Sequence, residues 1–180
     1  MFYIFLADGF EEVEALAPVD ILRRAKIPVT TVGVGGELIR GSHNICVKAD
    51  ICVDDLVLGE DTEGVILPGG MPGTRNLDAS AAVRAAVTYC ADRGLCVCAI
   101  CAAPSVLGHM GLLRGKRATC FPGFEGELDG ALTTGEKVTA DGNIITAKGA
   151  GCALEFGFAI TALARGQEAA DAVASAMQTR

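Results

Sequence analysis

One cysteine stands where a buried strand is expected to turn into a helix. The apolar run Leu95–Ile100 ends at Cys101, and Ala102–Pro104 follows with small residues and a proline. Small residues on both sides permit a tight strand-to-helix turn, and proline fits a first helical turn, where its missing N–H costs nothing. A thiol at such a turn lies over unpaired helix N-terminal amides, whose partial positive charge favours the thiolate. The pattern therefore predicts an activated cysteine nucleophile.

A carboxyl group at the start of the first predicted helix is the candidate proton partner of that thiol. Helical spacing of about 100° per residue turns Glu14 away from Glu12. It places Glu14 nearer the face that holds Val13 and Ala17, so partial burial is expected. A partly buried carboxyl beside a thiolate has a raised pKa and can donate a hydrogen bond to sulfur or exchange a proton with a substrate. Periodicity alone favours a simpler alternative, a carboxylate that caps the helix.

The elements that would position these groups alternate as in an α/β protein. Short β-branched runs and amphipathic segments follow one another, which is typical of a mostly parallel sheet covered by helices. Strands are predicted over residues 2–7, 28–34, 64–67, 95–100 and 117–121, and hairpins pair 37–40 with 45–48 and 138–140 with 144–147. Helices are predicted over residues 12–26, 79–92, 103–113, 152–165 and 168–178. We expect one domain spanning residues 1–180, because no linker or repeat divides the chain.

Three predicted loops follow the carboxyl ends of strands. They are residues 8–14, residues 68–73 and the turn at Cys101. In open α/β sheets, ligands bind at these ends, near the point where the strand order reverses. We therefore expect the three loops to meet at one site.

Composition and charge exclude several classes of partner. The chain has 180 residues, of which 51% are hydrophobic, and a formal net charge of −7. This charge, with no basic cluster longer than Arg23–Arg24, argues against nucleic acid or an anionic membrane as a partner. The N-terminus lacks the basic segment of a signal peptide, and no apolar run is long enough to span a membrane. A cytoplasmic location is expected, with the eight cysteines as reduced thiols.

Three further patterns do not predict a metal or cofactor site. Cys96 and Cys98 lie in an unbroken strand, without the turn that a zinc knuckle needs. Gly33–Leu38 precedes a predicted hairpin where a dinucleotide fingerprint needs a helix, and Gly69–Gly73 lacks the Gly-Lys-Ser/Thr end of a phosphate loop. His109 is expected to pack at a helix end. No cofactor and no metal are predicted.

Motifs along nearly the whole chain resemble the ThiJ/PfpI superfamily, in the branch of the parkinsonism-associated deglycase. The matching motifs are Gly9–Glu14, Pro18–Ala25, Leu67–Gly70, Ala99–Pro104 and Lys148–Gly151 before Glu155-Phe156. The resemblance implies a flavodoxin-like three-layer sandwich with a mostly parallel central sheet, in which the cysteine occupies a strand-to-helix nucleophile elbow. It also implies a homodimer.

The resemblance further implies how the site is built. The Cys101 sulfur would accept a hydrogen bond from a protonated Glu14. Backbone N–H groups of Gly69, Gly70 and Ala102 would line a small anion pocket, consistent with what glycine turns and helix starts offer.

Two departures from relatives narrow the expected chemistry. Ala102 stands where the protease-like branch has a histidine directly after the nucleophile, which disfavours a Cys-His peptidase. Phe121 stands where some deglycase relatives have a pocket histidine, so a mechanism that depends on that histidine is not expected. By resemblance, Arg24 and His43 are expected near the dimer-side mouth of the pocket.

The leading expectation is a cofactor-free enzyme of the glyoxalase or deglycase type. It would act on small aldehydes or glycated substrates through Cys101 and would protect against oxidative or carbonyl stress. An alternative is a redox sensor or chaperone-like protein that signals through oxidation of the cysteine to a sulfinic acid. A weaker alternative is an amidase or other hydrolase, which would need a histidine from a dimer partner.

Overall fold

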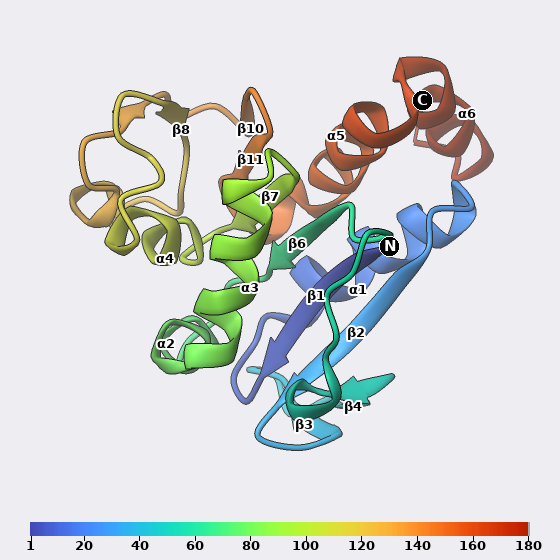
Figure 1. The fold of residues 1–180 in the computed structure, drawn as a ribbon. Coiled ribbons are helices and arrows are strands. Elements are labelled where there is room, and N and C mark those ends of the chain that lie inside the picture. The colour runs from blue at the N-terminus through green and yellow to red at the C-terminus, as the bar shows by residue number, and fades with distance from the viewer. Residues whose placement is uncertain (180) are drawn as a thin grey trace.

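A seven-stranded sheet with the order β10-β11-β7-β6-β1-β2-β5 forms the centre of the computed structural model, which describes residues 1–179 (Figure 1). Strand β10 pairs antiparallel with β11, and the other neighbouring strands pair parallel. The strands are β1 (Phe2–Ala7), β2 (Val29–Val34), β5 (Ile51–Cys52), β6 (Gly64–Leu67), β7 (Cys96–Ile100), β10 (Val138–Asp141) and β11 (Ile144–Ala147). The α/β class with a mostly parallel sheet is confirmed.

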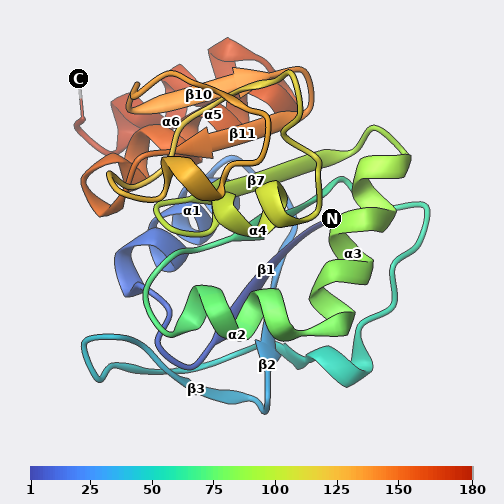
Figure 2. The same cartoon turned by 90° about the vertical axis from the view of Figure 1, so that its left-hand side faces the viewer.

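Helices cover both faces of this sheet (Figures 1 and 2). One face carries α1 (Glu12–Arg24) and α5 (Ala153–Arg165), with α6 (Gln167–Ala176) packed on α5. The other carries α2 (Gly73–Ala79), α3 (Ala81–Asp92) and α4 (Pro104–His109). Strand β1 is buried at all six residues, because parallel central strands are covered on both faces. Its side chains alternate between the two cores, with Phe2 and Ile4 in one and Tyr3 and Phe5 in the other.

Smaller elements lie outside the main sheet. Strands β3 (Leu38–Arg40) and β4 (Cys46–Lys48) form the predicted hairpin, and β8 (Arg117–Ala118) pairs with β9 (Leu132–Thr133). Single 3-10 turns cover Val53–Asp55, Glu125–Glu127 and Ala150–Cys152. Within residues 1–179, no helix combines the length and apolar character needed to cross a bilayer.

Three element predictions were wrong, each for a local reason. Helix α2 was not predicted, because its seven residues are too few to show helical periodicity. The helix after the cysteine ends at His109 rather than at residue 113, because Gly111 adopts a left-handed φ of 72° and its N–H bonds to Gly108 as a helix end does. The strand predicted over residues 117–121 pairs only over Arg117–Ala118, because the Thr119 N–H donates to the side-chain oxygen of Thr146 and not to a strand carbonyl.

The sheet order brings the three predicted loops together. Strands β1, β6 and β7 are neighbours, so the segments after Ala7, Leu67 and Ile100 leave the same edge of the sheet. The register pairs Leu67 with Ala99, which sets Gly69 level with Cys101 two residues further on. The site therefore forms at the carboxyl ends of three adjacent strands.

Candidate active site

Cys101 occupies a strained turn between β7 and α4. Its φ is 65°, in the left-handed region that non-glycine residues avoid, and such a conformation costs about 1–3 kcal/mol. Two hydrogen bonds hold the backbone there: the Cys101 N–H donates to the Ala147 carbonyl at 2.8 Å, and the Phe121 N–H donates to the Cys101 carbonyl at 2.7 Å. This is the geometry of a nucleophile elbow, which presents the side chain outward from the sheet edge. The thiol is partly exposed.

Glu14 is buried completely, at 0% exposure, on the inner face of α1. It shares that face with Pro18 and Ile21, whereas Val13 is 52% exposed, so helical spacing indicated burial correctly but the wrong neighbours. Its Oε2 accepts a hydrogen bond from the Gly69 N–H at 2.9 Å. Its Oε1 is buried with no hydrogen-bond partner among residues 1–179. Burial raises the pKa of this carboxyl from 4.5 to about 7.

Gly69 lies between the two side chains. A Cβ built on it would lie 2.6 Å from the Cys101 Cβ and 2.6 Å from the Glu14 Oε2, closer than real Cβ atoms approach. Only glycine therefore permits the carboxyl and the thiol to face one another here. The resemblance placed Gly69 in the anion pocket, and the structure instead directs its N–H to Glu14.

Replacing Gly69 with alanine should separate the pair. The new methyl group would push against Glu14 and Cys101 and weaken the 2.9 Å hydrogen bond to Oε2. We expect a loss of stability of about 1–3 kcal/mol from overpacking and a loss of catalytic rate of at least roughly tenfold. Denaturant unfolding and a turnover assay measure the two effects. As a control, Gly94→Ala adds a methyl group in open space at a left-handed turn, and it should lose stability without losing turnover.

Two backbone amides face the Cys101 thiol. Burial and the neighbouring Glu14 raise the pKa of Cys101 to about 12, while the N–H groups of Gly70 and Ala102 lower it. The net direction of the pKa shift is opposite to that predicted from the helix start alone, because burial of the thiol and, after it, the neighbouring Glu14 carboxylate outweigh the two backbone amides. The N–H groups of Gly70 and Ala102 can nevertheless donate hydrogen bonds to a negatively charged sulfur.

The two groups titrate as one unit. The pair loses its first proton near pH 7 and its second near pH 12, so between these values it holds one proton, which either sulfur or Glu14 can carry. With that proton on Glu14, the thiolate faces the Gly70 and Ala102 amides, and the repulsion between two negative charges disappears. The unpartnered Oε1 of Glu14 is then the oxygen with a proton to donate.

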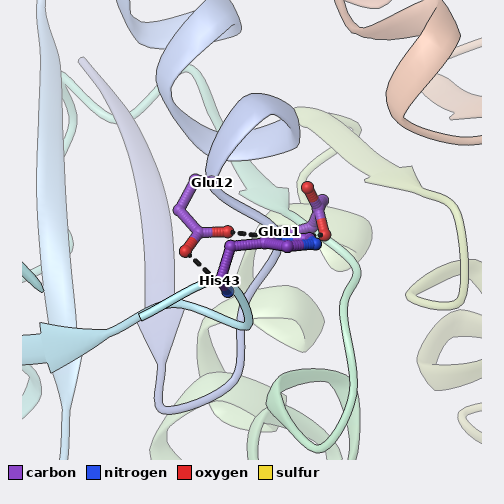
Figure 3. A group of neighbouring side chains, drawn as sticks. All are labelled: Glu11, Glu12 and His43. Carbon is purple, nitrogen blue, oxygen red and sulfur yellow. Dashed lines mark hydrogen bonds and ion pairs between the residues drawn. The ribbon is translucent and has the colours of Figure 1, made fainter. Parts of the chain in front are cut away.

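A polar clasp joins the β3–β4 loop to the start of α1 (Figure 3). The His43 Nδ1 lies 3.1 Å from the Glu12 Oε2 and 3.5 Å from the Glu11 Oε2, and Ser42 Oγ donates to Glu11 at 2.9 Å. The hydrogen bond to Glu12 and the charges of both carboxylates raise the pKa of His43. Since His43 contacts both Ser42 and Glu12 through Nδ1, these residues do not form a hydrolytic triad, which uses both ring nitrogens.

Backbone hydrogen bonds connect this clasp to the segment that positions Glu14. The Glu11 N–H donates to the Gly69 carbonyl at 2.9 Å, and Gly69 in turn donates to Glu14. His43 therefore lies at the edge of the site, near the segment that positions the carboxyl. Arg24 lies at the other end of α1, paired with Asp20 at 2.8 Å, so within this chain it is not brought to the site. Its place at a dimer-side mouth stays a prediction.

Phe121 contributes to the site through its backbone rather than its ring. Its side chain is 48% exposed, while its backbone N–H donates to the Cys101 carbonyl. Sequence reasoning noticed only the missing histidine at this position. It also missed Ala147, because backbone acceptors leave no signal in side-chain chemistry.

The other cysteines do not form a metal site with Cys101. Among residues 1–179, the one group of three donor side chains close enough to share an ion is Glu11, Glu12 and His43. All eight cysteines are free thiols, and Cys46 is the exposed one among them. A cavity of about 410 Å³ lined partly by Phe2, Cys96 and Asn143 lies at the amino ends of the strands, the edge opposite Cys101.

Comparison with known proteins shows what the chain is similar to. The model of the DJ-1/PfpI family matches residues 2–163. DJ-1alpha of Drosophila melanogaster is 36% identical over 177 residues, covering 97% of this chain and 82% of that protein. A deglycase of Pyrococcus abyssi is 29% identical over 147 residues, covering 81% of this chain and 87% of that protein.

A solved structure shows the same fold. Oxidized DJ-1 of Toxoplasma gondii superposes with a TM-score of 0.91 at 30% identity, covering 98% of this chain and 97% of that one. The flavodoxin-like architecture is thereby confirmed. On the family match and on identity over nearly the whole length, the chain belongs to the DJ-1/PfpI family.

Proposed function

We propose that the protein is a cysteine-dependent, cofactor-free enzyme that converts small reactive carbonyls, as a glyoxalase or deglycase. The observation that carries this proposal is the buried Glu14 carboxyl, coupled to the Cys101 thiol and supported by the Gly69 N–H. Such a pair holds one proton near neutral pH and can pass it between sulfur, oxygen and a bound substrate. The deglycase among its relatives supports the same class of activity.

With methylglyoxal as substrate, the thiolate of Cys101 attacks the aldehyde carbon, and a C–S bond forms. The oxygen takes the proton that Glu14 carries, giving a hemithioacetal. The Glu14 carboxylate then removes the hydrogen from that carbon and returns a proton to the neighbouring carbonyl carbon, while the hydroxyl proton of the hemithioacetal passes to the oxygen on that second carbon. This internal shift oxidises the first carbon to a thioester and reduces the second to an alcohol, so no external oxidant is needed. Water then releases lactate and restores the thiol.

The backbone amides stabilise charge during these steps. An oxyanion formed next to sulfur would lie near the N–H groups of Gly70 and Ala102, which face Cys101. Donors of this kind contribute on the order of 3 kcal/mol each when they are preorganised. On a glycated amine, the same attack and proton transfer would release a repaired amine, which is the deglycase form of the proposal.

The reaction type is tested by product formation. We expect the wild-type protein to convert methylglyoxal to lactate over many turnovers, without added thiol and at an unchanged rate in the presence of EDTA. The proton shift predicts that lactate made in heavy water carries deuterium on its second carbon, because the Glu14 proton exchanges with solvent. A protein that binds one equivalent of methylglyoxal and then stops would contradict the proposal.

A second candidate, a redox sensor, is favoured by the hydrogen-bonding groups around the thiol. Oxidation of Cys101 to a sulfinic acid would place oxygens near the Gly70 and Ala102 amides and the unpartnered Oε1 of Glu14. The solved structure of oxidized DJ-1 from Toxoplasma gondii is consistent with such a role in a relative.

Selective oxidation is the test of this second role. Under graded peroxide, Cys101 should gain two oxygens before the other seven thiols react, including the exposed Cys46. Glu14→Ala should make the sulfinic acid less stable against further oxidation, because the carboxyl that donates to it is gone. Peptide mass spectrometry measures both. Equal modification of Cys46 and Cys101 would count against a sensing role.

A further inference from the structure

The start of α1 holds Gly69 from two sides. The Glu11 N–H donates to the Gly69 carbonyl at 2.9 Å, and the Glu14 Oε2 accepts from the Gly69 N–H at 2.9 Å. The next residue, Gly70, packs so closely that a Cβ on it would collide with the Glu11 nitrogen, and its own N–H faces the Cys101 thiol. The position of Glu11 therefore fixes the backbone that contacts both members of the Cys101–Glu14 pair.

Glu11 is held by the β3–β4 loop and not by its own helix. It precedes α1 at the capping position, where its side chain makes no capping hydrogen bond. Its Oε2 instead accepts from Ser42 Oγ at 2.9 Å and lies 3.5 Å from the His43 Nδ1 (Figure 3). The Ser42 N–H also donates to the Phe10 carbonyl at 2.8 Å. The loop therefore fixes both the backbone and the carboxylate at this helix start.

The charges of the clasp also act on Glu14. Burial raises the pKa of Glu14, and the negative charge of Glu11 raises it further, against the hydrogen bonds with Cys101 and Gly69. His43 faces the two carboxylates Glu11 and Glu12, whose hydrogen bond and charges raise its own pKa. A protonated His43 offsets part of the charge of Glu11. Glu11 and His43 therefore affect the Glu14 proton in opposite directions.

We propose that Glu11 and His43 are positioning residues of the Cys101–Glu14 pair. Glu11 fixes Gly69 against the Glu14 carboxyl and places a negative charge nearby. Protonated His43 holds Glu11 and offsets that charge. Both residues act through Glu14 and take no part in bond making. The proposal rests on the coupling of the pair, and not on which carbonyl compound the protein converts.

Opposite changes in the pH dependence of Cys101 alkylation test this role, with iodoacetamide as the probe and EDTA present. In Glu11→Gln the amide still accepts the Ser42 hydrogen bond but carries no charge, so the midpoint should fall by about half a pH unit. In His43→Gln the charge of Glu11 is no longer offset, so the midpoint should rise by about the same amount. His43→Lys restores a positive charge and should return the midpoint toward the wild-type value.

His109→Gln is the matched control. This histidine also lies between two carboxylates, at 2.8 Å from Asp78 and 3.4 Å from Glu127, but outside the clasp. Its replacement removes an equivalent ion pair and should leave the midpoint of Cys101 alkylation unchanged. A clasp that only supports folding would affect the melting temperature in both histidine variants without separating their midpoints.

Three results would overturn the proposal: an unchanged midpoint in Glu11→Gln or His43→Gln, shifts of both in the same direction, or an equal shift in His109→Gln. Alkylation is measured without substrate, so this result is separate from the reaction itself. A protein that shows the opposite shifts but does not convert methylglyoxal would retain the positioning role and lose the proposed function.

Discussion

Cys101→Ser is expected to lower methylglyoxal turnover by a factor of about 10³ or more, to the rate without protein. A serine hydroxyl keeps the shape of the side chain but stays protonated at neutral pH, so no anion is available for attack on the aldehyde. The variant should fold, because Ala147 and Phe121 hold the backbone of residue 101 and not its side chain. Coupled detection of lactate gives the rate.

The matched control is Cys46→Ser. Cys46 is the exposed cysteine of the chain and lies in β4, away from the elbow. We expect this variant to keep the wild-type rate of turnover, which would show that the loss in Cys101→Ser comes from the thiol at the elbow and not from removing a cysteine elsewhere. Turnover by Cys101→Ser at the wild-type rate would remove the cysteine from the reaction.

Glu14→Gln is expected to lower turnover by a factor of about 10²–10⁴, the usual contribution of a positioned general acid and base. The amide accepts the Gly69 hydrogen bond as the carboxylate does, so the geometry at 2.9 Å is kept. It cannot take up or release a proton at neutral pH. The proton shift between the two substrate carbons should therefore fail even though the thiol is present.

The same variant should be more stable than the wild type above neutral pH. Burial raises the pKa of Glu14 from 4.5 to about 7, so the folded state binds this proton more tightly than the unfolded state. Because the pKa of Glu14 is higher in the folded state than in the unfolded state, the wild type loses stability as the pH rises from 4.5 to about 7. The loss is up to about 3 kcal/mol of the free energy of unfolding. Glutamine does not titrate and escapes this loss.

Denaturant unfolding at two pH values checks that sign. We expect Glu14→Gln to exceed the wild type at pH 8, and the difference to shrink toward zero by pH 5. A constant difference at both pH values would mean that Glu14 does not titrate in this range. A residue that lowers stability while supporting turnover is typical of sites selected for function.

Much of the fold could be predicted from the sequence, because long segments with periodic hydrophobicity make up most of it. The first strand and helix were predicted nearly to their ends, since the buried run Phe2–Ala7 and the amphipathic α1 each carry a strong pattern. The elbow was predicted from small residues around Cys101. Two-residue strands such as Ile51–Cys52 carry no periodic signal and were missed.

The site could be predicted only in part, because its residues follow separate strands that are distant in the sequence. Sequence placed Cys101 and Glu14 at strand ends, and the resemblance paired them. The role of Gly69 depends on the register of β6 against β7, which sets it level with the thiol. No local pattern reveals such a register. The raised pKa of Cys101 was missed for a related reason: the helix start is local, whereas the burial of the thiol and the neighbouring Glu14 carboxyl both depend on other parts of the chain.

The shared proton of Cys101 and Glu14 is measured by the pH dependence of Cys101 alkylation. In the wild type, the rate should rise with a midpoint near pH 7, because the pair then carries one negative charge, and transfer of its remaining proton from sulfur to Glu14 exposes the thiolate. In Glu14→Gln the midpoint should move above about 8.5, the range of an ordinary thiol. A wild-type midpoint at or above that value, or the same midpoint in both proteins, would contradict the shared proton.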